Sequence, residues 1–131
     1  MARVLVIDDD LDTRMLLEET LKSAGHEVVL ASDGKQGVAI YRTKPADIVI
    51  TDIYMPGKGG LETIIELRQS YPEVPIIALS GTGAARAMLS IAQKFGAVAV
   101  LQKPFAAQDL ITTLKKVLHG FLLIGALGLS Q

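Results

Sequence analysis

The sequence predicts an α/β fold in which a five-stranded parallel sheet lies between two layers of helices. Five short apolar runs rich in β-branched residues recur at similar spacing along the 131 residues. Segments with helical periodicity separate these runs, and glycine follows several of the segments. Half of the residues are apolar and 21% are charged, which is the balance of a globular domain.

The expected strands are almost uninterrupted in their apolar character. A strand buried on both faces of a parallel sheet has this pattern, whereas a strand with one exposed face alternates apolar and polar residues. The expected strands are Val4–Ile7, Val28–Ala31, Ile48–Ile50, Ile76–Leu79 and Val98–Leu101.

Helices are expected between and after these strands. They are Thr13–Ala24, Gly34–Arg42, Leu61–Ser70, Ala84–Phe95 and Ala107–His119. The first helix places Leu17, Leu21 and Ala24 on one apolar stripe. Gly25 and Gly96 follow the first and fourth helices, where glycine commonly ends a helix.

Strict alternation of strand and helix indicates a three-layer α/β/α sandwich, because parallel strands are joined by right-handed helical crossovers. For five strands we expect the sheet order 2-1-3-4-5. Sites in such folds form at the carboxyl ends of the strands, where the first and third strands lie side by side.

Polar residues follow four of the expected strands at that edge of the sheet. They are Asp8, Asp9 and Asp10 after the first strand, Asp52 after the third, Ser80 after the fourth and Lys103 after the fifth. Converging carboxylates repel one another unless a cation lies among them. The available ligands are hard oxygens, which favour Mg²⁺.

This set of groups fits phosphoryl transfer. The transferred group carries spread negative charge, which Mg²⁺ and the ammonium of Lys103 can neutralise. A carboxylate can act as the nucleophile and form an acyl phosphate, and the Ser80 hydroxyl can donate to the added oxygens.

Composition excludes several other functions. The chain has no cysteine, which excludes disulfides and thiolate chemistry, and a net charge of −1 gives no basic surface for direct binding of nucleic acid. The apolar run 4–7 is shorter than the about 7–15 residues of a signal-peptide core, and no run reaches the roughly 18 residues of a membrane helix. We therefore expect no transmembrane segment and a cytoplasmic location.

Four stretches in order resemble a response-regulator receiver domain, a flavodoxin-like family of two-component signalling and phosphorelays. They are VLVIDDD (4–10), DIVITDIYMPGKGG (47–60), IIALSG (76–81) and LQKPF (101–105). The resemblance implies a receiver domain over residues 1–119. The apolar segment 120–131 remains a tail that extends the last helix and packs or self-associates, contacts a membrane surface, or is the remnant of a linker.

The resemblance also implies a role for each polar residue at the strand ends. Asp52 would accept the phosphoryl group, with Lys103 and Ser80 assisting. Mg²⁺ would be held by the carboxylates of Asp8, Asp9 and Asp52 and by the backbone carbonyl of Tyr54. The Lys103–Pro104 peptide bond is expected to be cis, which an X-Pro bond permits at low cost.

The family further implies a signalling module and no enzyme in the usual sense, since it catalyses only its own phosphorylation and dephosphorylation. The donor would be a histidine kinase or a phosphotransfer protein. A downstream protein or a second copy would bind the face formed by 84–95, 98–101 and 107–119. One departure affects this switch, because Val100 stands where receivers often have tyrosine or phenylalanine.

Three alternative interpretations remain at this stage. Asp8 and Asp9 could cap the first helix, although Asp10 and Asp12 suit that role better. The chain could be a phosphohydrolase, since its first aspartates resemble the strand-end pair of haloacid-dehalogenase-like phosphatases. It could also be a degenerate receiver that binds partners without being phosphorylated, which Val100 leaves open.

Overall fold

The computed structural model describes residues 1–55, 59–81 and 85–126 of the chain. Strands and helices alternate along it, as the sequence predicts. The elements are β1 (Arg3–Ile7), α1 (Leu11–Ser23), β2 (Glu27–Ala31), α2 (Gly34–Thr43), β3 (Ile48–Asp52), α3 (Gly60–Ser70), β4 (Ile76–Ser80), α4 (Ala85–Phe95), β5 (Ala99–Gln102) and α5 (Ala107–Ala126).

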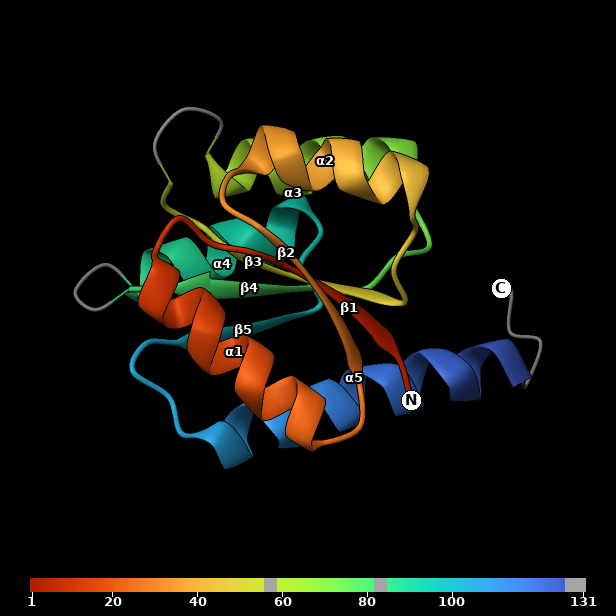
Figure 1. The fold of residues 1–131 in the computed structure, drawn as a ribbon. Coiled ribbons are helices and arrows are strands. Elements are labelled where there is room, and N and C mark those ends of the chain that lie inside the picture. The colour runs from red at the N-terminus through yellow and green to blue at the C-terminus, as the bar shows by residue number, and fades with distance from the viewer. Residues whose placement is uncertain (56–58, 82–84, 127–131) are drawn as a thin grey trace.

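All five strands are parallel, and their order is β2-β1-β3-β4-β5, which confirms the predicted topology. Helices α2, α3 and α4 cover one face of the sheet, and α1 and α5 cover the other (Figure 1). The register between β1 and β3 pairs Ile7 with Thr51, so the residues that follow these strands leave the sheet side by side.

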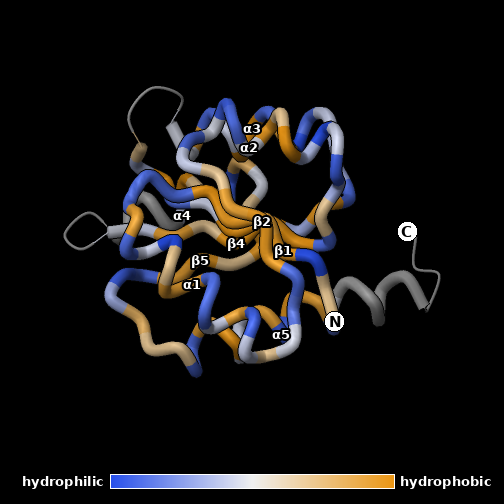
Figure 2. The backbone as a smooth tube through the Cα atoms, viewed as in Figure 1, coloured by the Kyte–Doolittle hydropathy of each residue, from blue (hydrophilic) through white to orange (hydrophobic). Residues whose placement is uncertain are grey.

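Each face of the sheet has its own apolar core. Leu5 and Ile7 pack towards α2 and α3, whereas Val4 and Val6 pack towards α1 and α5, and all four are 0–1% exposed. Burial of one such side chain is worth about 1.5–3 kcal/mol. Figure 2 shows the consequence, an apolar sheet enclosed by helices that mix hydrophobic and hydrophilic residues.

The predicted ends of the elements lie close to those observed, with one exception. Gly25 and Gly96 have φ angles of 92° and 127°, so both occupy the left-handed region in which glycine ends a helix. The last helix was expected over Ala107–His119, with an extension into 120–131 left open, and α5 continues to Ala126. A single glycine such as Gly120 costs a helix about 1 kcal/mol and does not by itself end it.

The C-terminal turns of α5 extend past the edge of the sheet (Figure 1). Within the described part of the chain, no helix has both the length and the apolar character that crossing a membrane requires.

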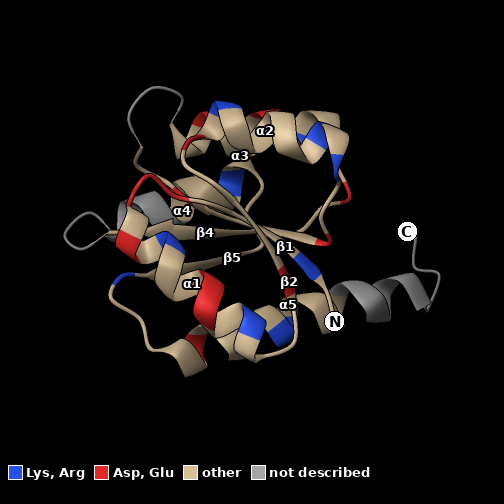
Figure 3. Ribbon diagram, in the orientation of Figure 1, with Lys and Arg blue, Asp and Glu red and all other residues tan. Residues whose placement is uncertain are grey.

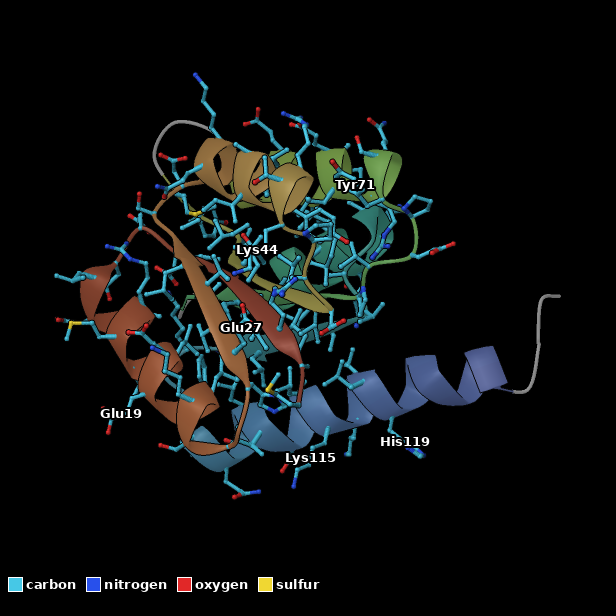
Figure 4. All side chains as sticks on the ribbon, turned by 45° about the vertical axis from the view of Figure 1, so that its right-hand side comes forward. Glu19, Glu27, Lys44, Tyr71, Lys115 and His119 are labelled. Carbon is cyan, nitrogen blue, oxygen red and sulfur yellow. The ribbon has the colours of Figure 1, made fainter. Side chains whose placement is uncertain are left out.

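Exposed ion pairs connect β2 to its surroundings at the opposite end of the sheet from the aspartates. Glu27 accepts a hydrogen bond from Arg3 Nε at 3.1 Å and lies 3.1 Å from Lys44 Nζ (Figure 4). These hydrogen bonds hold the pKa of Glu27 below its usual value. Because both pairs are solvent-exposed, they add little to stability.

The start of α3 approaches the end of β3 so closely that only glycine fits at residue 60. The amide of Gly60 donates to the carbonyl of Ile53 at 2.9 Å. A Cβ atom at Gly60 would overlap the carbonyl oxygen of Asp52 and lie 2.7 Å from its carbonyl carbon. Gly60 therefore fixes the backbone directly after Asp52.

We predict that Gly60→Ala lowers the free energy of unfolding by about 2–3 kcal/mol, because backbone atoms cannot move aside as a flexible side chain can. Gly59→Ala is the matched control, since a Cβ there would meet only Glu62 Oε1 at an ordinary 3.6 Å. This control should remain within about 1 kcal/mol of wild type. Urea unfolding followed by circular dichroism measures both, and equal losses would contradict the close approach.

Candidate functional site

Three carboxylates converge at the carboxyl ends of β1 and β3. One oxygen each from Asp8, Asp9 and Asp52 lies within 4.8 Å of the others. Asp8 is fully buried, Asp52 is 7% exposed and Asp9 is exposed. Acidic residues at the end of β1 and the start of α1 stand out in Figure 3. The structure thus brings together the three carboxylates that the sequence predicts at this edge.

Lys103 reaches this cluster from the segment that follows β5. Its Nζ donates to Asp8 Oδ2 at 2.9 Å and to Asp52 Oδ2 at 3.2 Å. Its backbone amide donates to the Ser80 carbonyl at 2.7 Å, which fixes the segment against the end of β4. The Lys103–Pro104 bond is cis, as the resemblance implies.

Burial and the neighbouring charges both shift the pKa values of these groups. Burial raises the pKa of Asp52, the ammonium of Lys103 lowers it and the charge of Asp8 raises it, and the net pKa is above the usual value. Burial lowers the pKa of Lys103, but its hydrogen bond to Asp8 and the charge of Asp52 outweigh burial and raise the pKa overall. The lysine is therefore held as a cation, and Asp52 ionises at some cost.

Tyr54 and Ser80 lie at the same edge of the sheet, Tyr54 bonded to Asp52 through its amide and Ser80 at the end of β4, which pairs with β3. The amide of Tyr54 donates to Asp52 Oδ1 at 3.3 Å, while the residue as a whole is 54% exposed. The hydroxyl of Ser80 is buried and donates to the Gly81 carbonyl at 3.4 Å. Ser80 follows Leu79, the register partner of Asp52, and a stronger acceptor could replace the Gly81 carbonyl in its long hydrogen bond.

The donor set fits a hard divalent cation. Three carboxylates with one ammonium leave negative charge that is not compensated, and every available ligand in the cluster is oxygen. Mg²⁺ typically binds a few carboxylates and keeps several waters, and the exposed Asp9 leaves such a site open to solvent.

The capping role falls to Asp10, as the sequence suggested. Asp10 Oδ2 accepts from the amide of Thr13 at 3.3 Å and from its hydroxyl at 2.7 Å. Asp12 lies in the first turn of α1. Asp8 instead uses Oδ1 to accept from the amide of Asp10 at 2.9 Å, so its side chain orders the loop before the helix.

Sequence reasoning missed one residue at the site. Arg14, on α1, donates from Nη1 to the backbone carbonyl of Asp8 at 2.7 Å. A contact between a side chain and a carbonyl six residues earlier has no periodic pattern, so only the presence of an arginine in the first turn of the helix after the aspartates could have suggested it.

Val100 lies on β5, where it pairs with Ala78 of β4 and packs, half-buried, against the core beneath α2, α3 and α4. It therefore belongs to the apolar packing. Pro56, Gly57 and Lys58, in the quoted motif after β3, lie outside the described residues.

The chain matches known proteins over most of its length. Residues 4–115 match the model of the response regulator receiver domain. The chain is 37% identical to the chemotaxis protein CheY of Thermotoga maritima over 116 residues, which are 88% of this chain and 96% of CheY. It is 33% identical to the transcriptional regulatory protein CpxR of Klebsiella pneumoniae over 119 residues, which are 91% of this chain and 50% of CpxR.

Solved structures agree with these relatives. A response regulator receiver domain protein from Clostridium thermocellum superposes with a TM-score of 0.87 at 32% identity, covering 95% of this chain and 99% of that one. NtrX from Brucella abortus gives a TM-score of 0.93 at 30% identity, covering 97% of this chain and 29% of that one. The chain therefore spans about half of CpxR and less than a third of that NtrX chain.

The chain belongs to the response regulator receiver family. Membership assigns it to two-component signal transduction, in which receiver domains act as phosphoacceptors and interact with histidine kinases and downstream effectors.

The raised pKa of Asp52 predicts that the site weakens the fold when no divalent cation is present. Folding is disfavoured at pH values above that raised pKa, and the penalty disappears below the ordinary pKa of the unfolded chain. In EDTA at pH 7, Asp52→Asn should therefore be more stable than wild type by about 1 kcal/mol. Urea titrations from pH 7 downward should show the difference shrinking, and a less stable variant at pH 7 would contradict this balance.

Proposed function

We propose that this domain accepts a phosphoryl group on Asp52 from a histidine kinase or a phosphotransfer protein, in a Mg²⁺-dependent reaction that switches its surface. The observation that carries the proposal is the position of Asp52. It is nearly buried, it shares a lysine with Asp8, and it lies in a carboxylate cluster suited to Mg²⁺.

In the proposed reaction, an oxygen of Asp52 attacks phosphorus, the bond between phosphorus and the donor's imidazole nitrogen breaks, and an acyl phosphate forms. Bound Mg²⁺ supplies neutralising charge for the phosphoryl oxygens. Asp8 and Asp9 would hold this ion together with Asp52 and the Tyr54 carbonyl. Lys103 contacts Asp52 Oδ2 in the resting domain and supplies a second positive charge at the new group.

The response is proposed to pass through Ser80 to the face formed by α4, β5 and α5. Among the described residues, the Ser80 hydroxyl bonds only to the Gly81 carbonyl, at a long distance, and a phosphoryl oxygen is a stronger acceptor. Movement of Ser80 would alter the end of β4, which pairs with β5. A downstream protein or a second copy would bind the altered face.

We predict that the protein gains one phosphoryl group when incubated with Mg²⁺ and a small acyl phosphate, measured by intact-mass spectrometry. Asp52→Asn and excess EDTA should each abolish the gain, because the first removes the nucleophile and the second removes the cation. Asp12→Asn, on the exposed start of α1, is the matched control and should gain the group as wild type does.

An undiminished gain in Asp52→Asn would refute the assignment of the acceptor. Catalytic turnover of small phosphate esters that is lost in Asp8→Asn but kept in Asp52→Asn would instead identify a phosphohydrolase.

Ser80 provides a separate prediction for the switch. A hydrogen bond between its hydroxyl and a charged phosphoryl oxygen is worth about 1.5–3 kcal/mol. Ser80→Ala should therefore be phosphorylated on Asp52 but populate the switched state about tenfold less. Amide chemical shifts of β4 and β5 before and after phosphorylation measure this, with the exposed Ser70→Ala as control. Equal shift changes in Ser80→Ala and wild type would remove Ser80 from the switch.

Val100 is an aliphatic residue packed against the core, and it is the feature that keeps the degenerate-receiver alternative open. That alternative is tested on wild-type protein. Partner binding by wild type that is the same with and without phosphodonor and Mg²⁺ would favour it.

A further inference from the structure

Asp8 has a partner for each of its polar groups. Its amide donates to the Ala31 carbonyl at 3.1 Å, Oδ1 accepts from the Asp10 amide at 2.9 Å, and Oδ2 accepts from Lys103 at 2.9 Å. Its own carbonyl accepts from Arg14 Nη1 at 2.7 Å. Because Asp8 is 0% exposed, water cannot replace a lost partner without rearrangement.

Asp9 is held quite differently. It is exposed, and among the described residues no hydrogen bond or ion pair involves its carboxylate. Its oxygen nevertheless lies within 4.8 Å of oxygens of Asp8 and Asp52. Its direction therefore depends on the backbone from which the side chain leaves.

The Arg14 bond acts on that backbone. The carbonyl of Asp8 belongs to the rigid, planar peptide that joins Asp8 to Asp9, so fixing this oxygen fixes the orientation of the peptide. The guanidinium is permanently charged, which strengthens its hydrogen bond. In the described part of the chain no carboxylate pairs with Arg14, so the bond to Asp8 is not shared with a competing ion pair.

We propose that Arg14 is a positioning residue for the divalent-cation site, an inference that rests on the proposed function. It holds the peptide between Asp8 and Asp9 so that both carboxylates point at one ion. It touches neither the ion nor the phosphoryl group.

The first test titrates Mg²⁺ alone, without phosphodonor, into wild type and variants while following amide chemical shifts of residues 8–10. Arg14→Met should bind Mg²⁺ about tenfold more weakly, which is the usual loss when a partner of a metal ligand is removed. Arg14→Lys keeps one charged donor, so its affinity for Mg²⁺ should lie between those of wild type and Arg14→Met. Lys22→Met, on the exposed face of the same helix, should bind as wild type does.

A second readout separates positioning from chemistry. The Mg²⁺ concentration that gives half the maximal phosphorylation rate should rise about tenfold in Arg14→Met, while the rate at saturating Mg²⁺ is retained. A rate that stays low at saturating Mg²⁺ would overturn the positioning role. Should Arg14→Met fail to fold, Arg14→Lys carries the same comparison.

The two proposals fail in different ways. If wild type binds Mg²⁺ and Arg14→Met weakens this binding, but Asp52 never gains a phosphoryl group, the proposed function fails and the role of Arg14 stands. If wild type is phosphorylated and Arg14→Met binds Mg²⁺ with unchanged affinity, the role of Arg14 is wrong. A wild-type protein that binds no Mg²⁺ overturns both.

Discussion

The parallel pairing of β1 with β3 forces Asp8 and Asp52 close together, and the rest of the site depends on how this negative charge is balanced. Ile7 and Thr51 are register partners, so the residues that follow them leave neighbouring strands at the same edge. Both carboxylates are buried there, and Lys103 bonds to each of them. One ammonium offsets only part of two or three carboxylates, which leaves the site suited to a further cation and then to phosphoryl oxygens.

A site with this imbalance needs a stable framework, and the two apolar cores provide it. The inner strands contribute side chains that are essentially inaccessible on both faces of the sheet, such as Val4 and Leu5. Gly60 adds a geometric constraint, since it lets α3 begin directly against the backbone of Asp52. Asp52 is thus held on both sides along the chain, because it is the last residue of β3 and α3 begins directly against its backbone.

The fold and most of the site could be predicted from the sequence because their causes are repetitive or chemically distinctive. Continuous apolar runs define buried strands, and parallel topology brings their polar ends together, which located Asp8, Asp52 and Lys103. Individual hydrogen bonds have no such pattern. The reach of Arg14 to a carbonyl, and the bond of Ser80 to Gly81, depend on rotamers that only the packed structure specifies. The end of α5 could not be fixed from the sequence, because glycine weakens a helix without determining where it stops.

Val100 changes how a signal could cross the sheet, because a half-buried valine has no ring that could move between two environments. A backbone link remains available. The amide of Lys103 donates to the carbonyl of Ser80 at 2.7 Å, so the end of β4 and the segment that carries the lysine are joined directly. Under the proposed function, both residues would respond to the same phosphoryl group. A shift of either would therefore be transmitted through this bond to β5 and α5, whether or not an aromatic side chain takes part.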